Sequence, residues 1–299
     1  MILVTGGAGV MGSRLVRALC EAGKTVRVLA LPNDQGLVRL KDLDCEIVNA
    51  DISNKDSLAG VCNGVTCVFH LAAIIIAVNP ESFQRVNVQG THNILQESMR
   101  SGVKHFIFVS SISVTYPVST PYSISKRKCE EMITRQERLK WTIVRPTLAY
   151  DKGGGQEFVM FMNALLRFPV AFLVGSGKAV KNPVYVPDLI RGFLALPENN
   201  KAHNKIYNFC GSEEISVREL AELILELRGI RSFIVPIPLW CCKIMASISE
   251  LLTTNSPLTW NGIVGLTQNA DPDWSQAKLD LGYSPVGVRE GLRQVLAGS

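Results

Sequence analysis

The sequence is poor in the residues that build metal sites and disulfide frameworks. Its 299 residues include only four histidines, and its eight cysteines contain no C-x-x-C pair, so we expect no metal and interpret the cysteines as thiols of a reducing compartment. The net charge is +5, and the lysine and arginine residues form no long block of like charge, which excludes a nucleic-acid-binding arm. Prolines and charged residues interrupt even the most apolar stretch, 233–252, so we expect no membrane span. No signal leader precedes the first apolar run, and a cytoplasmic location is expected.

Hydrophobic residues, in contrast, make up 47% of the chain, which is enough for a large core. Over the first half, apolar runs of strand length alternate with segments of helical period, which predicts an α/β fold with a Rossmann-like, doubly wound parallel sheet and helices on both faces. The pattern changes near residue 151. We therefore expect a sheet domain at 1–150 and a smaller C-terminal lobe at 151–299, interleaved with the sheet through a strand near 205–209. The other expected strands are 1–4, 25–31, 45–49, 67–71, 105–110 and 141–144.

A glycine-rich loop follows the first expected strand. Gly6, Gly9 and Gly12 stand directly before a segment whose apolar residues have helical spacing. Glycines at such positions let the backbone approach a pyrophosphate, and the positive end of the following helix holds the phosphates. A glycine turn without a ligand is the plain alternative, but the strand before the loop and the helix after it favour a dinucleotide site. The domain at 1–150 is thus expected to bind NAD(P).

Tyr122 and Lys126 are four residues apart on an expected helix, so their side chains share one face. An ammonium group held near a phenol favours the phenolate and lowers the pKa of the phenol, which would make the pair a proton shuttle. Ser111, at the end of the fifth expected strand, could hydrogen-bond a substrate oxygen while Tyr122 exchanges its proton. The adjacent carbon would then exchange a hydride with a nicotinamide.

These motifs, taken together, resemble the extended short-chain dehydrogenases/reductases, in the NAD-dependent epimerase/dehydratase family. The matches run in the order of the family along nearly the whole chain, and that order is more specific than any single motif. They are T-G-x-x-G-x-x-G from Thr5, D-I from Asp51, H-L-A-A from His70, N-V-x-G-T from Asn87, V-S-S from Val109, Y-x-x-x-K from Tyr122, R-P from Arg145, V-Y-V-x-D-L from Val184 and L-G-Y-x-P from Leu281.

The resemblance implies roles for the matched residues. Asn87, Ser111, Tyr122 and Lys126 would form a catalytic tetrad, with Asn87 at a helix distortion. Ser111 and Lys181 would also contact the substrate. The cofactor would be NAD, with NADP left open, and the family often forms homodimers. The residues implied in cofactor binding are Gly6, Gly9, Val10, Met11, Gly12, Asp51, Ile52, Leu71, Ala72, Ala73, Tyr122 and Lys126.

The sequence departs at three places from the sugar-nucleotide enzymes of this family. No acidic residue stands at 29–31, after the second expected strand, which leaves the choice between NAD and NADP open. The stretch between Ser111 and Tyr122 is short, so the loop over the substrate is trimmed. Of the cations expected on a substrate diphosphate, Lys181 occupies one place, and T-W-N-G at 259–262 replaces another.

Three functions therefore stay open. Overall resemblance favours an enzyme that epimerises, dehydrates or reduces a nucleotide-sugar through bound NAD(P). The apolar segment 233–252, which could be a lid, a pocket wall or core, favours a dehydrogenase or reductase of an apolar secondary alcohol, similar to dihydroflavonol reductases or beta-hydroxysteroid dehydrogenases. The third is a non-catalytic NAD(P)-binding regulator or subunit, and the complete tetrad argues against it.

Overall fold

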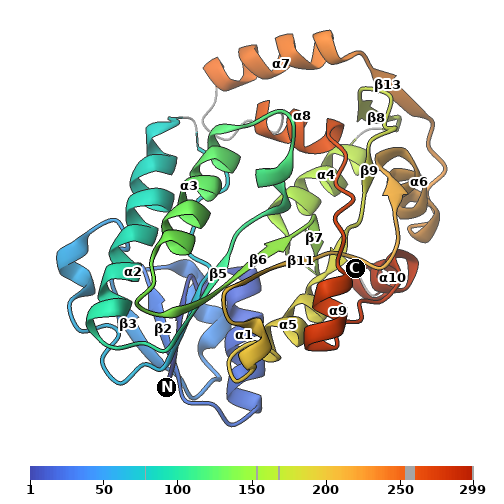
Figure 1. Cartoon of the computed structure of the whole chain (residues 1–299). Helices are drawn as coiled ribbons and strands as arrows, with labels where there is room; N and C mark the ends of the chain where they lie inside the picture. Colours follow the sequence, from blue (N-terminus) through green and yellow to red (C-terminus); the bar gives the residue numbers. More distant parts are fainter. Residues whose placement is uncertain (78, 153, 168, 253–259, 298–299) are drawn as a thin grey trace.

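The computed structural model describes residues 1–77, 79–152, 154–167, 169–252 and 260–297. Seven strands form its central sheet, in the order β11-β6-β5-β4-β1-β2-β3 (Figure 1). All neighbouring pairs are parallel. With helices on both faces, the sheet confirms the predicted Rossmann-like, doubly wound architecture. Its strands are β1 (Ile2–Thr5), β2 (Val26–Ala30), β3 (Glu46–Asn49), β4 (Cys67–His70), β5 (His105–Val109), β6 (Lys140–Pro146) and β11 (Lys205–Phe209).

Two layers of helices cover this sheet. One layer consists of α1 and α5, the other of α2 and α3. The helices of the domain are α1 (Val10–Glu21), α2 (Gly90–Arg100), α3 (Pro121–Arg135) and α5 (Val186–Leu194), with the π-helical turn η3 (Phe83–Gln89) and the 3-10 turns η1 (Gln35–Leu40), η2 (Lys55–Leu58), η4 (Ile112–Thr115) and η5 (Asn200–Ala202).

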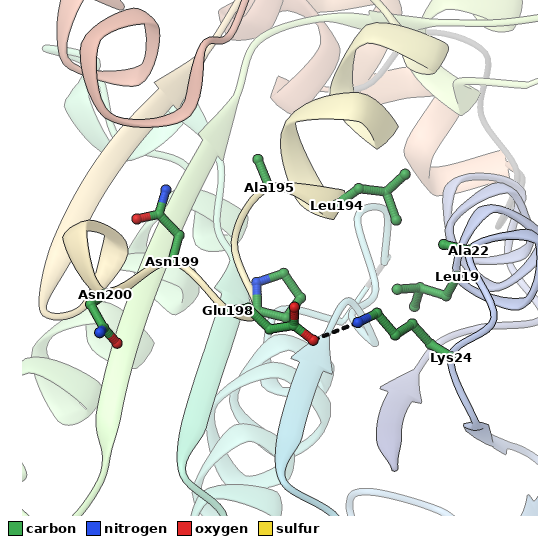
Figure 2. A pocket seen from close by; sticks show the side chains of 9 residues that line it. Leu19, Ala22, Lys24, Leu194, Ala195, Glu198, Asn199 and Asn200 are labelled. Carbon is green, nitrogen blue, oxygen red and sulfur yellow. Dashed lines mark hydrogen bonds and ion pairs between the residues drawn. The ribbon is translucent and has the colours of Figure 1, made fainter.

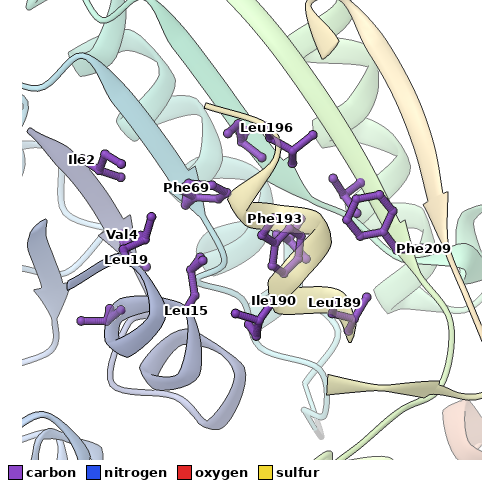
Figure 3. Packing of buried hydrophobic residues seen from close by; sticks show 14 of the residues in the cluster. Ile2, Val4, Leu15, Leu19, Phe69, Leu189, Ile190, Phe193, Leu196 and Phe209 are labelled. Carbon is purple, nitrogen blue, oxygen red and sulfur yellow. The ribbon is translucent and has the colours of Figure 1, made fainter. Parts of the chain in front are cut away.

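Alternate residues of the strands pack into the two layers. Val4 of β1 joins the core beneath α1 and α5, where Phe193 packs edge-on against Phe69 with ring centroids 6.0 Å apart (Figure 3). Its neighbour Leu3 joins the opposite core, with Ile94 of α2. Strands buried on both faces need apolar residues at every position, which explains the continuous apolar runs in the sequence.

The second half of the chain adds a lobe with its own hydrophobic core, centred on α4, α6 and α10. Its helices are α4 (Gln156–Leu166), α6 (Val217–Leu227), α7 (Leu239–Leu252), α8 (Trp260–Thr267) and α10 (Val288–Leu296). The helix α9 (Ser275–Leu281) instead packs against β11, and its Ala277 belongs to the core beneath α1 and α5. The strand pairs of the lobe are β7 (Ala149–Tyr150) with β10 (Val184–Tyr185), β9 (Val180–Lys181) with β12 (Ile215–Ser216), and β8 (Ala171–Val174) with β13 (Ile234–Ile237).

Within the described residues, no helix is both long and apolar enough to cross a membrane. The same part of the chain contains no group of histidine, cysteine and acidic side chains able to hold a metal ion. The eight cysteines are free thiols.

Candidate active site

The glycine loop joins β1 to α1 and leaves no room for side chains at two of its positions. Gly6 has a left-handed backbone with φ +70°, and a Cβ atom at Gly12 would lie 2.1 Å from the Gly6 carbonyl oxygen. Gly9 differs, because a Cβ atom there would meet only that same oxygen, at 3.2 Å. No side chain caps α1, whose first two residues are Val10 and Met11. An uncapped helix start beside open space fits the pyrophosphate of a dinucleotide.

The loop after β4 touches the glycine loop through a buried histidine. His70 Nδ1 lies 2.6 Å from Thr5 Oγ1 and His70 Nε2 lies 2.9 Å from Thr91 Oγ1. Burial lowers the pKa of His70 to about 3, so the ring is neutral. The Thr5 hydroxyl accepts a hydrogen bond from the Ala72 N–H at 3.2 Å, and a Cβ atom at Gly6 would come within 2.8 Å of that nitrogen. The predicted cofactor residues Leu71 and Ala72 therefore border the glycine loop, and Ala73 follows them in the chain.

The predicted adenine-binding residues follow β3 at the same edge of the sheet. Asp51 Oδ1 accepts a hydrogen bond from the Ser53 N–H at 2.8 Å. Ile52 is buried, and its carbonyl accepts a hydrogen bond from Asn93 Nδ2 at 2.9 Å. Arg39, on η1, also contacts the glycine loop, where its Nη1 donates a hydrogen bond to the Ala8 carbonyl at 3.1 Å. This contact was not predicted from the sequence.

Tyr122 stands in the first turn of α3, where Thr120 and Ser123 form a capping box around Pro121. Its ring packs edge-on against Phe83, with centroids 6.2 Å apart. Burial raises the pKa of the Tyr122 phenol, the negative charge of Glu157 adds to this, and interaction with the Ser111 side chain opposes it. The phenol is therefore protonated at neutral pH.

Lys126 lies one helical turn further along α3 and is buried. Its Nζ donates to the Val109 carbonyl at 2.6 Å and lies 4.4 Å from the centre of the Phe108 ring. Burial lowers the pKa of Lys126 to about 8. The expected lowering of the Tyr122 pKa is wrong for the protein without ligand, because the ammonium group is bonded to a strand carbonyl and burial dominates at the phenol.

Asn87 lies in the π-helical turn η3 and is buried. Its amide bonds to both backbone groups of Ile74, accepting at 2.9 Å from the N–H and donating at 3.0 Å to the carbonyl. Its Nδ2 also donates to Ser125 Oγ at 3.0 Å. Asn87 thus ties the loop after β4 to α3, beside Lys126.

A cavity of about 180 Å³ opens beside Ser111 and Tyr122, between the sheet domain and the lobe. It is smaller than the 300–1,000 Å³ typical of drug-sized ligand sites. Its walls come mainly from the segment 111–122, α4, α8 and β8, with contributions from α6 and the loop after β4, and they are mostly aliphatic and aromatic. The polar residues along it, besides Ser111 and Tyr122, are Ser113, Tyr116, Thr120, Thr147, Glu157 and Lys181.

Lys181 also lines this cavity, but its ammonium group is already bonded. Its Nζ donates to the Gly265 carbonyl at 2.6 Å and to the Gln268 carbonyl, at the end of α8, and lies 5.3 Å from the centre of the Tyr116 ring. Burial lowers the pKa of Lys181 to about 8. The residue therefore fastens α8 over the cavity.

The apolar segment 233–252 forms β13 and α7 and contributes no described residue to the cavity lining. Cys242 and Ala246 of α7 pack against Ile263 of α8. Trp240 and Ile244 are 66% and 53% exposed. The described part of α7 therefore supports α8 from outside. The T-W-N-G motif lies only partly within the described residues, and its Gly262 lines the cavity.

A second hollow lies at the other end of α1, near the amino end of β2 (Figure 2). An ion pair between Lys24 and Glu198, both exposed, crosses it. It is far from the strand ends that carry the predicted site residues, so we assign no chemistry to it.

Sequence reasoning missed Glu157, in the first turn of α4. The positions 157, 160, 161, 164 and 165 all line the cavity, and they have the spacing of one helix face. That spacing was visible in the sequence, but only the structure shows what the face covers.

Comparison with known proteins places this site in a family. The model of the NAD dependent epimerase/dehydratase family matches residues 2–210. A 3 beta-hydroxysteroid dehydrogenase/Delta 5-->4-isomerase of Mycobacterium tuberculosis is 30% identical over 266 residues, covering 77% of this chain and 70% of that protein. A UDP-glucose 4-epimerase of Vibrio cholerae is 24% identical over 329 residues, covering 98% and 93%. The dTDP-glucose 4,6-dehydratase DesIV of Streptomyces venezuelae, solved with NAD bound, superposes with a TM-score of 0.79 at 25% identity, covering 99% and 95%. As its motifs predicted, the chain belongs to the NAD-dependent epimerase/dehydratase family of extended short-chain dehydrogenases/reductases, with NAD(P) as its cofactor.

Proposed function

We propose that this protein interconverts an apolar secondary alcohol and its ketone, with NAD(P) as the redox partner. The observation that carries the proposal is the cavity beside Ser111 and Tyr122, whose walls are mostly apolar. Such a cavity binds its ligand chiefly by hydrophobic burial, and a few polar groups orient it. The relative that is named for a 3-beta-hydroxysteroid supports the same substrate class.

A nucleotide-sugar fits this cavity less well. Proteins hold diphosphates with arginine and lysine side chains, and Lys181 is the single such side chain among the described lining residues. Its ammonium group is bonded to two carbonyls, and Glu157 adds a negative charge nearby. The prediction of a nucleotide-sugar rests on the epimerases and dehydratases among the relatives, not on this cavity.

In the proposed reduction, Tyr122 is the proton donor. Ser111 Oγ hydrogen-bonds the substrate carbonyl oxygen, and the Tyr122 phenol, protonated at neutral pH, gives its proton to that oxygen. Reduced NAD(P), when bound, supplies the hydride that the carbonyl carbon accepts. Lys126 would hold the nicotinamide ribose of the bound cofactor, and Asn87 ties the loop after β4 to α3 beside it. Ser111 and Tyr122 line the cavity, and Lys126 and Asn87 lie behind it on α3 and η3, an arrangement that supports an enzyme over a non-catalytic regulator.

Gly9 would lie against the pyrophosphate of the bound cofactor, so a side chain there should block binding without unfolding the protein. We expect Gly9→Val to raise the Kd for NAD(P) at least about tenfold, because the methyl groups enter the space left for the pyrophosphate. The melting temperature of the cofactor-free variant should fall much less than that of Gly12→Val, since a Cβ atom at Gly9 makes one tight contact, with the Gly6 carbonyl oxygen at 3.2 Å, whereas a Cβ atom at Gly12 would lie 2.1 Å from that oxygen. Calorimetric titration and thermal melting measure the two quantities, and an unchanged Kd contradicts the assignment of the loop.

The substrate class can be tested by turnover. Purified protein is given NADH or NADPH with decan-2-one or a 3-ketosteroid, and separately NAD with UDP-glucose, with Tyr122→Phe as the inactive control. We expect oxidation of the cofactor that depends on the apolar ketone, and no formation of UDP-galactose. Conversion of UDP-glucose without reduction of either ketone would overturn the proposal.

A further inference from the structure

One side chain in the cavity has no task in the proposed hydride transfer. Glu157 belongs to the face of α4 that also presents Met160, Phe161 and Ala164 to the cavity. Its carboxyl group lies close enough to Tyr116, Tyr122 and Lys181, which line the same cavity, for its charge to shift their pKa values, so the carboxyl group faces the cavity. A ligand in the cavity must therefore meet this carboxyl group.

Glu157 also has no hydrogen-bond or ion-pair partner within the described part of the chain. The nearby cation is Lys181, and its ammonium group is committed to the carbonyls of Gly265 and Gln268. Burial raises the pKa of the Glu157 carboxyl, and the positive charge of Lys181 opposes that shift. A carboxyl group among apolar walls is unfavourable unless something bonds to it, so the missing partner is expected on the ligand.

We propose that Glu157 is a specificity-determining residue, which accepts a hydrogen bond from an ammonium or hydroxyl group of an otherwise apolar substrate and excludes anionic substrates. This inference rests on the proposed function, because it places the donor on the same molecule whose alcohol or ketone reacts at Tyr122. Attraction between the carboxylate and an ammonium group is stronger in a poorly solvated cavity than in water, and repulsion of an anion is stronger for the same reason. The enzyme would thus distinguish apolar molecules of similar shape by the charge of a second group.

Binding of three probes that share one alkyl chain tests the inference. Octylamine, octan-1-ol and octanoate are titrated calorimetrically into the full chain, so that no turnover is needed. We expect octylamine to bind at least about tenfold more tightly than octanoate, with octan-1-ol between them. The neutral isostere Glu157→Gln should bring octylamine and octanoate within about threefold of each other.

Glu137→Gln is the matched control. Glu137 is exposed and lies just beyond the end of α3. The helix from Tyr122 to its end is about 20 Å long at the usual rise per residue, so Glu137 is remote from Tyr122. Its replacement removes the same charge from the chain as Glu157→Gln does. The ranking of the probes should be unchanged in this variant.

Two outcomes separate this inference from the proposed function. If octanoate binds the parent protein as tightly as octylamine, the proposed role of Glu157 is wrong, while the proposal that the cavity binds apolar molecules is supported. If none of the three probes binds, the proposal that the cavity binds apolar molecules is wrong, and the proposed role of Glu157 is wrong as well. The parent ranking is decisive even if Glu157→Gln does not fold.

Discussion

Tyr122→Phe should lower kcat by about 100-fold or more, the effect expected when a positioned proton donor is lost. The fold and the affinity for NAD(P) should remain nearly intact, because the ring still packs against Phe83 and only the hydroxyl group disappears. Steady-state kinetics with the best apolar ketone measure kcat, and calorimetric titration measures the affinity for the cofactor.

Tyr116→Phe is the control for this experiment. Tyr116 lines the same cavity, and burial raises the pKa of its phenol as well. Its ring, however, lies beside Lys181, whose Nζ is 5.3 Å from the centre of the Tyr116 ring. We expect kcat within a few-fold of the parent for Tyr116→Phe. If the two variants exchange these outcomes, Tyr116 is the proton donor and the site is misassigned.

Lys126→Met should abolish turnover and, at the same time, change how stability depends on pH. The pKa of Lys126 is about 8 in the folded protein against an ordinary value of 10.5. Between these values the unfolded chain binds more protons, so the free energy of unfolding of the parent rises with pH through this window. The difference corresponds to about 3 kcal/mol, and the variant should lack that part of the rise.

Urea unfolding of the cofactor-free proteins at pH 7 and pH 10.5 measures this effect. Lys181 has the same depressed pKa and contributes equally to both proteins, so it cancels in the comparison. Lys128→Met is the control, because Lys128 is exposed on the same helix and should leave the pH dependence unchanged. A parent and a Lys126→Met variant with parallel curves would show that Lys126 is not a buried charge.

The fold could be predicted from the sequence because strands and helices leave local patterns in it. An apolar run at 25–31 predicted the strand that the structure bounds at Val26–Ala30, and the alternation of such runs with helical segments is sufficient to predict a parallel sheet. The start of α3 at Pro121 follows from the capping box at Thr120, a signal present in the sequence and overlooked. The helix ends at Arg135, because Gln136 is extended.

The electrostatics of the site could not be predicted, because the decisive partners are distant in the chain. Lys126 is 17 residues from the carbonyl it binds, and Lys181 is 84 and 87 residues from its two partners. No spacing in the sequence shows that these ammonium groups are already bonded. The division at residue 150, the homodimer and the cytoplasmic location stay predictions.

The proposed reaction is a net transfer of hydride between NAD(P) and an apolar substrate. The direct measurement is mass spectrometry of the product formed from the apolar ketone and NADH or NADPH that carries deuterium at C4 of the nicotinamide, with each of the two C4 faces labelled in turn. For one of the two faces, we expect one deuterium at the carbinol carbon of each product molecule and one cofactor molecule oxidised per product. Product without deuterium from either face, or sugar-nucleotide conversion with no net oxidation of cofactor, would contradict it.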